Sequence, residues 1–155
     1  MMGITKPFAR VVFTIAGVWG ILIMTPLYFT FDAVGRAYPP PITHPDLYYG
    51  FIGVTLAWQI AFLVIATDPV RYRTIMLAGI LEKLLYVTTM IVLCFRGYLQ
   101  PGQAAVIIVP DGTLGLLFVA AFFRTPIVEV APAHSTEHSQ TRVLNTHSVQ
   151  RVPHL

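Results

Sequence analysis

Four long runs of apolar residues, separated by short polar segments, divide the first four-fifths of the chain. They cover approximately residues 11–31, 47–67, 74–95 and 104–123. Each run is close to the ~20 residues that a helix needs to cross a hydrocarbon core of ~30 Å. Unpaired backbone groups are too costly in lipid, so such spans must be helical. The pattern therefore predicts an all-α fold, an integral membrane four-helix bundle formed by residues 1–125.

The polarity changes abruptly after the fourth run. Residues 126–155 are polar and rich in Ser, Thr, His and Gln, which is typical of a disordered tail. His134 and His138 are four residues apart, but Pro132 makes the helix that would bring them together improbable. We therefore predict no metal site in the tail.

The composition agrees with a membrane protein. Hydrophobic residues make up 55% of the chain and charged residues only 11%, whereas soluble domains average about 25% charged residues. The single cysteine, Cys94, excludes an intramolecular disulfide. The first run is longer than the ~7–15 apolar residues of a signal peptide, so we expect it to be retained. The scattered basic residues lack the clustering of a nucleic-acid surface.

The basic residues near the span ends predict the orientation. One side of the bundle would carry Lys6, Arg10, Arg71, Arg73 and Arg124, and the other side Arg36 and Arg96. The side richer in basic residues normally faces the cytoplasm. We therefore expect both termini in the cytoplasm of a multi-pass protein of the cell membrane, the inner membrane if the chain is bacterial.

Small residues suggest how the helices pack. A stripe at helical spacing on the second span and glycines on the first and fourth spans would allow close approach. The stripe consists of Gly50, Gly53, Ala57 and Ala61, and its expected counterparts are Gly17, Gly20, Gly112 and Gly115. Thr25-Pro26 should kink the first span, because proline removes a helical hydrogen bond. The short link around Asp68-Pro69 predicts that the second and third spans are antiparallel neighbours.

Two adjacent charges on the third span are the strongest functional signal. Glu82 and Lys83 lie roughly 12–13 Å beyond Thr74 at 1.5 Å per residue. A charge at that depth costs at least ~2.5 kcal/mol, so an ionisable residue there is a functional-site hypothesis by default. The lysine stem is too short to reach water easily. We therefore expect partners on other helices.

The second span supplies candidate partners at the same depth. Gln59 is as far from the link as Glu82, Trp58 is its neighbour, and Tyr86 is one turn beyond Glu82 on the same face. The spacing predicts a polar cluster of Trp58, Gln59, Glu82, Lys83 and Tyr86. This cluster is interpreted as a hydrogen-bonded clasp between helices, as a ligand, proton or substrate site, or as a contact to another subunit.

A second polar group is expected on the outer side. Asp111, between Pro110 and Gly112, is interpreted as the N-cap of the fourth helix, with residues 104–109 extended. The alternative is a buried acid beside a proline kink. Asp46, after His44-Pro45, is expected to cap the second helix. Asp111, His44, Asp46 and Arg36 lie on this side and together would line a polar vestibule; the alternative is that His44 and Asp46 serve only the start of the second helix.

Several strings resemble a pattern found in small bacterial membrane proteins of unknown activity. They are residues 44–51 (HPDLYYGF), 58–59 (WQ), 68–73 (DPVRYR) and 82–83 (EK), within a likeness that spans roughly residues 8–125. In size and four-helix layout the chain also resembles the DoxX-like group. That second resemblance is architectural and implies no site residues.

Three functions remain open. The first is an accessory or structural protein, or a subunit of a membrane complex with other membrane subunits or in a homodimer, for which the helices and a polar clasp suffice. The second is a binder or carrier of a small lipophilic molecule, such as a quinone or lipid, around Glu82. The third is a proton-coupled enzyme or transporter that uses Glu82. No phosphate-binding glycine loop or nucleophile elbow is present, so we identify no catalytic residue and no cofactor.

Overall fold

The computed structural model describes residues 5–37 and 41–127. These residues form five α-helices and one 3-10 helix, and the described part contains no strand. In chain order the elements are α1 (Thr5–Met24), η1 (Thr25–Phe29), α2 (Phe31–Ala37), α3 (Pro45–Thr67), α4 (Arg73–Phe95) and α5 (Pro101–Arg124). The predicted tail lies almost entirely outside the described residues, and so do His134 and His138.

Four helical stretches are long and apolar enough to cross a membrane, as the hydrophobic pattern predicts. They are Pro7–Phe29, Pro45–Thr67, Arg73–Phe95 and Pro101–Arg124. The first departs from the prediction at its end. It narrows to the 3-10 turn η1 at Thr25, directly before Pro26, and the chain then turns into the short helix α2. Where a proline kink was expected, the helix tightens locally into a 3-10 turn, which accommodates Pro26 and its nitrogen without a hydrogen.

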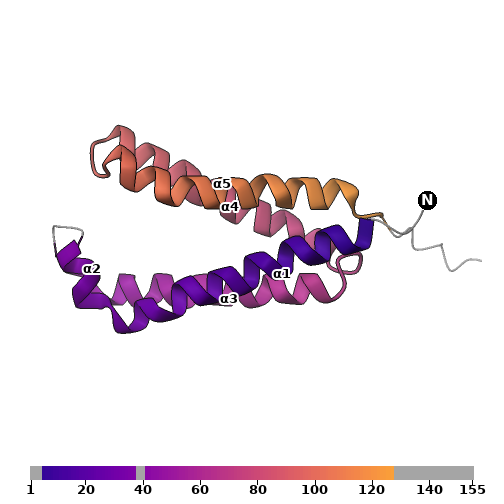
Figure 1. Cartoon of the computed structure of the whole chain (residues 1–155), viewed down its shortest axis with the longest axis horizontal. Helices are drawn as coiled ribbons and strands as arrows, with labels where there is room; N and C mark the ends of the chain where they lie inside the picture. Colours follow the sequence, from indigo (N-terminus) through magenta and orange to yellow (C-terminus); the bar gives the residue numbers. More distant parts are fainter. Residues whose placement is uncertain (1–4, 38–40, 128–155) are drawn as a thin grey trace, which may run out of the picture.

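The long helices are arranged as two pairs that meet at one end and separate towards the other (Figure 1). α1 packs along α3, and α4 packs along α5. Contacts between the pairs run mainly from α1 to α5, and α3 touches α4 much less. The second and third spans, expected to be close neighbours, thus belong to different pairs. Their short link keeps them together mainly near their connected ends.

The buried core fills the end where the pairs meet, which we call the closed end. Its residues come from the first two-thirds of α1, the second half of α3, the start of α4 and the second half of α5. They are Ala9, Val12, Phe13, Ala16, Phe62, Ile65, Ala66, Met76, Phe118 and Ala121. The opposite half, where α2 and the α4–α5 connection lie, has no comparable cluster among the described residues.

Arginines fasten the helix termini at the closed end. Arg10 on α1 donates from Nε to the carbonyl of Ala66 and from Nη2 to that of Thr67, both at 3.1 Å. Arg73 on α4 donates to the carbonyl of Thr125 at 3.0 Å. The last carbonyls of a helix have no partner within it. These cationic donors therefore satisfy the ends of α3 and α5 and also match the helix dipoles.

Close approach between α1 and α3 depends on two glycines of α1. A Cβ at Gly17 would lie 2.7 Å from Leu63 and 2.9 Å from the Gln59 carbonyl, and one at Gly20 would overlap the Gln59 side chain. The predicted stripe on α3 has a smaller part in this packing. Gly50 has nothing within 4 Å of an added Cβ, and Gly53 meets only the Tyr28 hydroxyl, at 3.4 Å. Among the predicted glycines of α5, Gly112 is open and Gly115 faces the Lys83 Cβ at 3.3 Å.

The fourth span corrects the interpretation of Asp111. α5 is continuous from Pro101 to Arg124, with Pro110 inside it, and its N-cap is Gln100. Asp111 therefore lies near the middle of the helix and does not cap it. The helix begins at Pro101 because the Gln100 and Gln103 side chains form a reciprocal capping box there.

Candidate functional site

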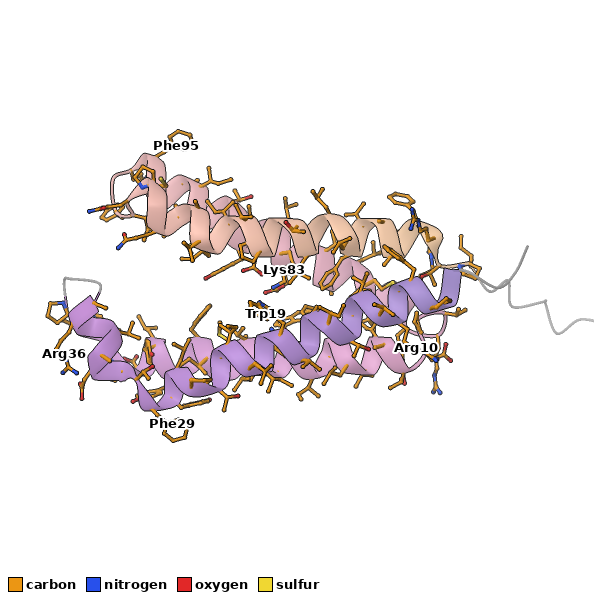
Figure 2. The ribbon with its side chains drawn as sticks, in the orientation of Figure 1. Arg10, Trp19, Phe29, Arg36, Lys83 and Phe95 are labelled. Atoms are coloured by element: carbon orange, nitrogen blue, oxygen red, sulfur yellow. The ribbon has the colours of Figure 1, made fainter. Side chains whose placement is uncertain are left out.

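A cavity of about 390 Å³ lies between the two helix pairs, on the side of the core that faces the open half of the bundle. All four long helices contribute to its wall. The lining residues are Ala16, Trp19, Gly20, Ile23 and Met24 of α1, Phe51, Thr55 and Gln59 of α3, Glu82, Lys83 and Tyr86 of α4, and Val106, Ile107, Pro110, Asp111 and Leu114 of α5. Figure 2 shows the side chains of Trp19 and Lys83 directed from opposite pairs into this space. We call it the intramembrane cavity.

The centre of the polar wall is an ion triad formed by Lys83, Asp111 and Glu82. The Lys83 ammonium lies 2.5 Å from Oδ1 of Asp111 and donates a hydrogen bond to it. It also lies 3.4 Å from Oε2 of Glu82. Only 6% of Lys83 is exposed. Lys83 and Asp111 thus join α4 to α5 near the midpoints of both helices.

Glu82 is the least satisfied member of the triad. Its Oε2 is buried and, among the described residues, accepts no hydrogen bond, although the Lys83 ammonium is close enough for an ion pair. A buried carboxylate oxygen without a hydrogen bond is costly, and in native structures it usually marks a site for a further donor. Glu82 lines the intramembrane cavity, so a molecule inside the cavity could supply that donor.

Four of the five residues in the predicted polar cluster line this one cavity: Gln59, Glu82, Lys83 and Tyr86. Trp58 does not line it. Its ring packs against Phe62, 5.9 Å between centroids, beside the core. The amide of Gln59 donates to the Thr55 carbonyl one turn back, at 3.1 Å. Equal distance from the α3–α4 link correctly matched the depths of Gln59 and Glu82, but which face Trp58 presents depended on the packing of α1.

Sequence reasoning missed Trp19 and the role of Asp111. Trp19 lines the cavity from α1, and nothing in its local sequence separates it from an ordinary aromatic residue of a span. Asp111 did carry a signal, because it is an acid within an apolar run. A position close to the middle of the 104–123 run, opposite the basic residue of another span, would have favoured the buried-acid alternative.

Three phenylalanine rings pack in the core next to the ion triad. Phe13, Phe62 and Phe118 pack together, with Phe13 stacked on Phe118 at 4.3 Å and Phe62 edge-on to Phe118 at 4.9 Å. The Lys83 ammonium lies 5.7 Å from the centre of the Phe62 ring. Gly79 allows this arrangement, because a Cβ there would lie 3.0 Å from Phe62.

The proline of α5 contributes to the wall in another way. Pro110 has no N–H, so the carbonyl of Val106, four residues earlier, loses its usual helical donor. Both residues line the cavity.

Of the residues expected in an outer vestibule, Asp111 lines the intramembrane cavity, whereas His44, Asp46 and Arg36 do not, and the vestibule itself stays a prediction. His44 is the N-cap residue of α3 and makes no side-chain capping bond, while Asp46 lies in the first turn and is exposed. Asp111 is committed to Lys83 in the middle of α5. The expected cap by Asp46 is therefore wrong by two positions, because proline is favourable in the first turn and moves the start of the helix to Pro45.

Comparison with known proteins adds no relative. No protein-family model, no curated protein and no solved structure matches the chain. The resemblance to the DoxX-like group stays a prediction, and the function has to be argued from the cavity itself.

Proposed function

We propose that this protein binds a small lipophilic molecule in the intramembrane cavity, with the polar group of the molecule against Glu82. The observation that carries the proposal is a cavity of about 390 Å³ that reaches a mid-helix carboxylate. Pockets for small molecules typically measure ~300–1,000 Å³ and are mostly apolar with a few convergent polar groups. A bundle built only as a clasp would be expected to close over its ion pair, because an open, unfilled space forfeits packing contacts.

The lining matches a molecule with an apolar body and one polar end. Ile23, Met24, Phe51, Ile107 and Leu114 supply apolar surface, while the oxygens of Glu82 and Asp111 lie on one side. Methionine and aromatic side chains adapt to ligands of irregular shape. Because all four helices form the wall, such a molecule would also bridge the two helix pairs and stabilise the bundle.

The other two functions expected from the sequence stay predictions. A role as an accessory or complex subunit requires no cavity, and nothing in the fold identifies a partner. A proton-coupled role would use Glu82 with a water path, and the triad alone does not supply a path. A binding role accounts for both the cavity and the unsatisfied carboxylate.

Native mass spectrometry of the full chain in mild detergent tests the proposal. We expect a co-purifying small molecule at high occupancy on the wild-type protein. Leu114→Trp should reduce that occupancy at least about tenfold, because the indole fills the cavity. Leu116→Trp is the matched control, since Leu116 lies on the same helix, is 74% exposed and does not line the cavity. A wild-type protein without a bound molecule, or equal occupancy in both variants, would contradict the proposal.

A further inference from the structure

We infer that the preferred ligand of the intramembrane cavity is a lipophilic cation, namely a protonated amine on an apolar body. This inference rests on the proposed binding function and adds the charge of the ligand. The starting observation is the ionisable lining of the cavity, which consists of two carboxylates and one ammonium: Glu82, Asp111 and Lys83. With all three ionised, the lining carries one excess negative charge.

The pairing within the triad assigns that excess charge to Glu82. Lys83 is 2.5 Å from Asp111 and hydrogen-bonded to it, whereas it is 3.4 Å from Glu82 and makes no hydrogen bond there. An uncompensated charge at mid-membrane depth is costly, so a bound cation gains electrostatic energy that a neutral ligand does not. An ammonium group also brings N–H donors for the buried Oε2 of Glu82.

The rest of the wall favours a cation over an anion. The rings of Trp19, Phe51 and Tyr86 line the same cavity, and aromatic faces attract cations by about 0.5–2 kcal/mol. Lys83, the cation that would bind an anionic ligand, is already held by two carboxylates.

Fluorescence quenching in nanodiscs of phosphatidylcholine can measure this preference. The chain has two tryptophans, so Trp58→Phe leaves Trp19 in the cavity wall as the single reporter. The probes are 11-bromoundecylammonium, 11-bromoundecanol and 11-bromoundecanoate, which share the chain and the quenching bromine and differ in charge. A reference protein with Trp19→Phe, Trp58→Phe and Leu116→Trp reports the concentration of each probe in the surrounding lipid.

The measured quantity is the bilayer concentration of each probe that quenches half of the Trp19 fluorescence, after correction with the reference protein. We expect this concentration to be about tenfold or more lower for the ammonium probe than for the alcohol. Glu82→Gln should remove this advantage, because it removes the negative charge that favours the ammonium over the alcohol. Asp111→Asn removes the same charge and is the second variant if Glu82→Gln does not fold. Asp68→Asn, in the exposed α3–α4 link, should leave the advantage intact.

The possible failures can be told apart. Equal quenching by ammonium and alcohol, or stronger quenching by the carboxylate, would overturn the inferred charge preference while the proposed binding function stands. If none of the probes quenches Trp19 more than the reference indole, the binding function and the inference both fail. An ammonium advantage that survives both Glu82→Gln and Asp111→Asn would also overturn the inference.

Discussion

The ammonium of Lys83 meets the carboxylate of Asp111 at 2.5 Å, from the middle of α4 to the middle of α5. The two residues are the main polar connection within the α4–α5 pair. Lys83 is also the sole basic side chain in the cavity wall, where Glu82 stands beside it. The stability of the pair and the charge of the cavity are therefore set by the same side chain.

Removing the lysine should destabilise the bundle strongly. In Lys83→Met two carboxylates remain buried without a cation, so we expect a loss of about 3–5 kcal/mol in the free energy of unfolding. Unfolding by SDS in mixed micelles measures this change. The triple variant Glu82→Gln, Lys83→Met, Asp111→Asn should recover most of the loss, because no buried charge is left. If Lys83→Met were as stable as the wild type, the charges of the triad would be solvated in the bilayer, which would contradict this prediction.

Two neighbouring glycines in the α1–α3 interface should differ in how much their substitution by alanine lowers the stability. Gly17→Ala places its Cβ against the Leu63 side chain and the Gln59 backbone carbonyl, whereas the three atoms nearest to a Cβ at Gly20 all belong to the Gln59 side chain. We expect a loss of about 1–3 kcal/mol for each variant, larger for Gly17→Ala. The second substitution Gln59→Ala should restore the stability of the Gly20→Ala variant but not that of the Gly17→Ala variant. Gly50→Ala, which meets nothing within 4 Å, is the neutral control in the same unfolding assay.

Arg73 should contribute through its shape as well as its charge. Its Nε donates to the Thr125 carbonyl at 3.0 Å, and its guanidinium lies 3.8 Å from the centre of the Phe122 ring. Lysine cannot reproduce a planar group that donates and stacks together. We therefore expect Arg73→Lys to lower the free energy of unfolding by about 1 kcal/mol. Arg71→Lys serves as the control, since Arg71 is exposed and lies 5.5 Å from the Tyr72 ring. Equal effects at the two positions would contradict this assignment.

The orientation prediction can be tested with topology reporters. Arg10 and Arg36 lie at opposite ends of the molecule (Figure 2), with Arg10 at the closed end. If the end richer in basic residues faces the cytoplasm, green fluorescent protein fused after residue 155 should fluoresce. Alkaline phosphatase inserted between α4 and α5 should be active, because that connection would then be outside. The reverse pattern of the two reporters would show the opposite orientation.

The hydrophobic pattern was enough to predict the four spans, because the length of a span is set by the thickness of the bilayer. Depth was also predictable, since counting residues from the α3–α4 link placed Gln59 and Glu82 in one layer. Rotation of each helix about its axis was not. That rotation depends on which helices pair, and the pairing of α1 with α3 is decided by the close approach at Gly17 and Gly20. For this reason the predicted polar cluster included Trp58, which does not line the cavity, and omitted Trp19, which does.

Asp111 shows a different limit. A proline followed by an acid is a common start for a helix, and local rules favoured that reading. The partner that makes a buried acid tolerable, Lys83, lies 28 positions away in sequence. Only the three-dimensional arrangement of α4 against α5 shows that the acid is paired.

The two helix pairs are held together mainly at the closed end, so their separation at the opposite end can change by rotation about the closed end. The arginine contacts and the phenylalanine core form the hinge region. The separation of the two helix pairs sets the width of the cavity beside Glu82. A slight rotation at the hinge region becomes a larger displacement further along the helix pairs. In a bilayer, lateral pressure from the acyl chains would act on the two helix pairs, so we expect the thickness and packing of the bilayer to affect the size of the molecule that the cavity accepts.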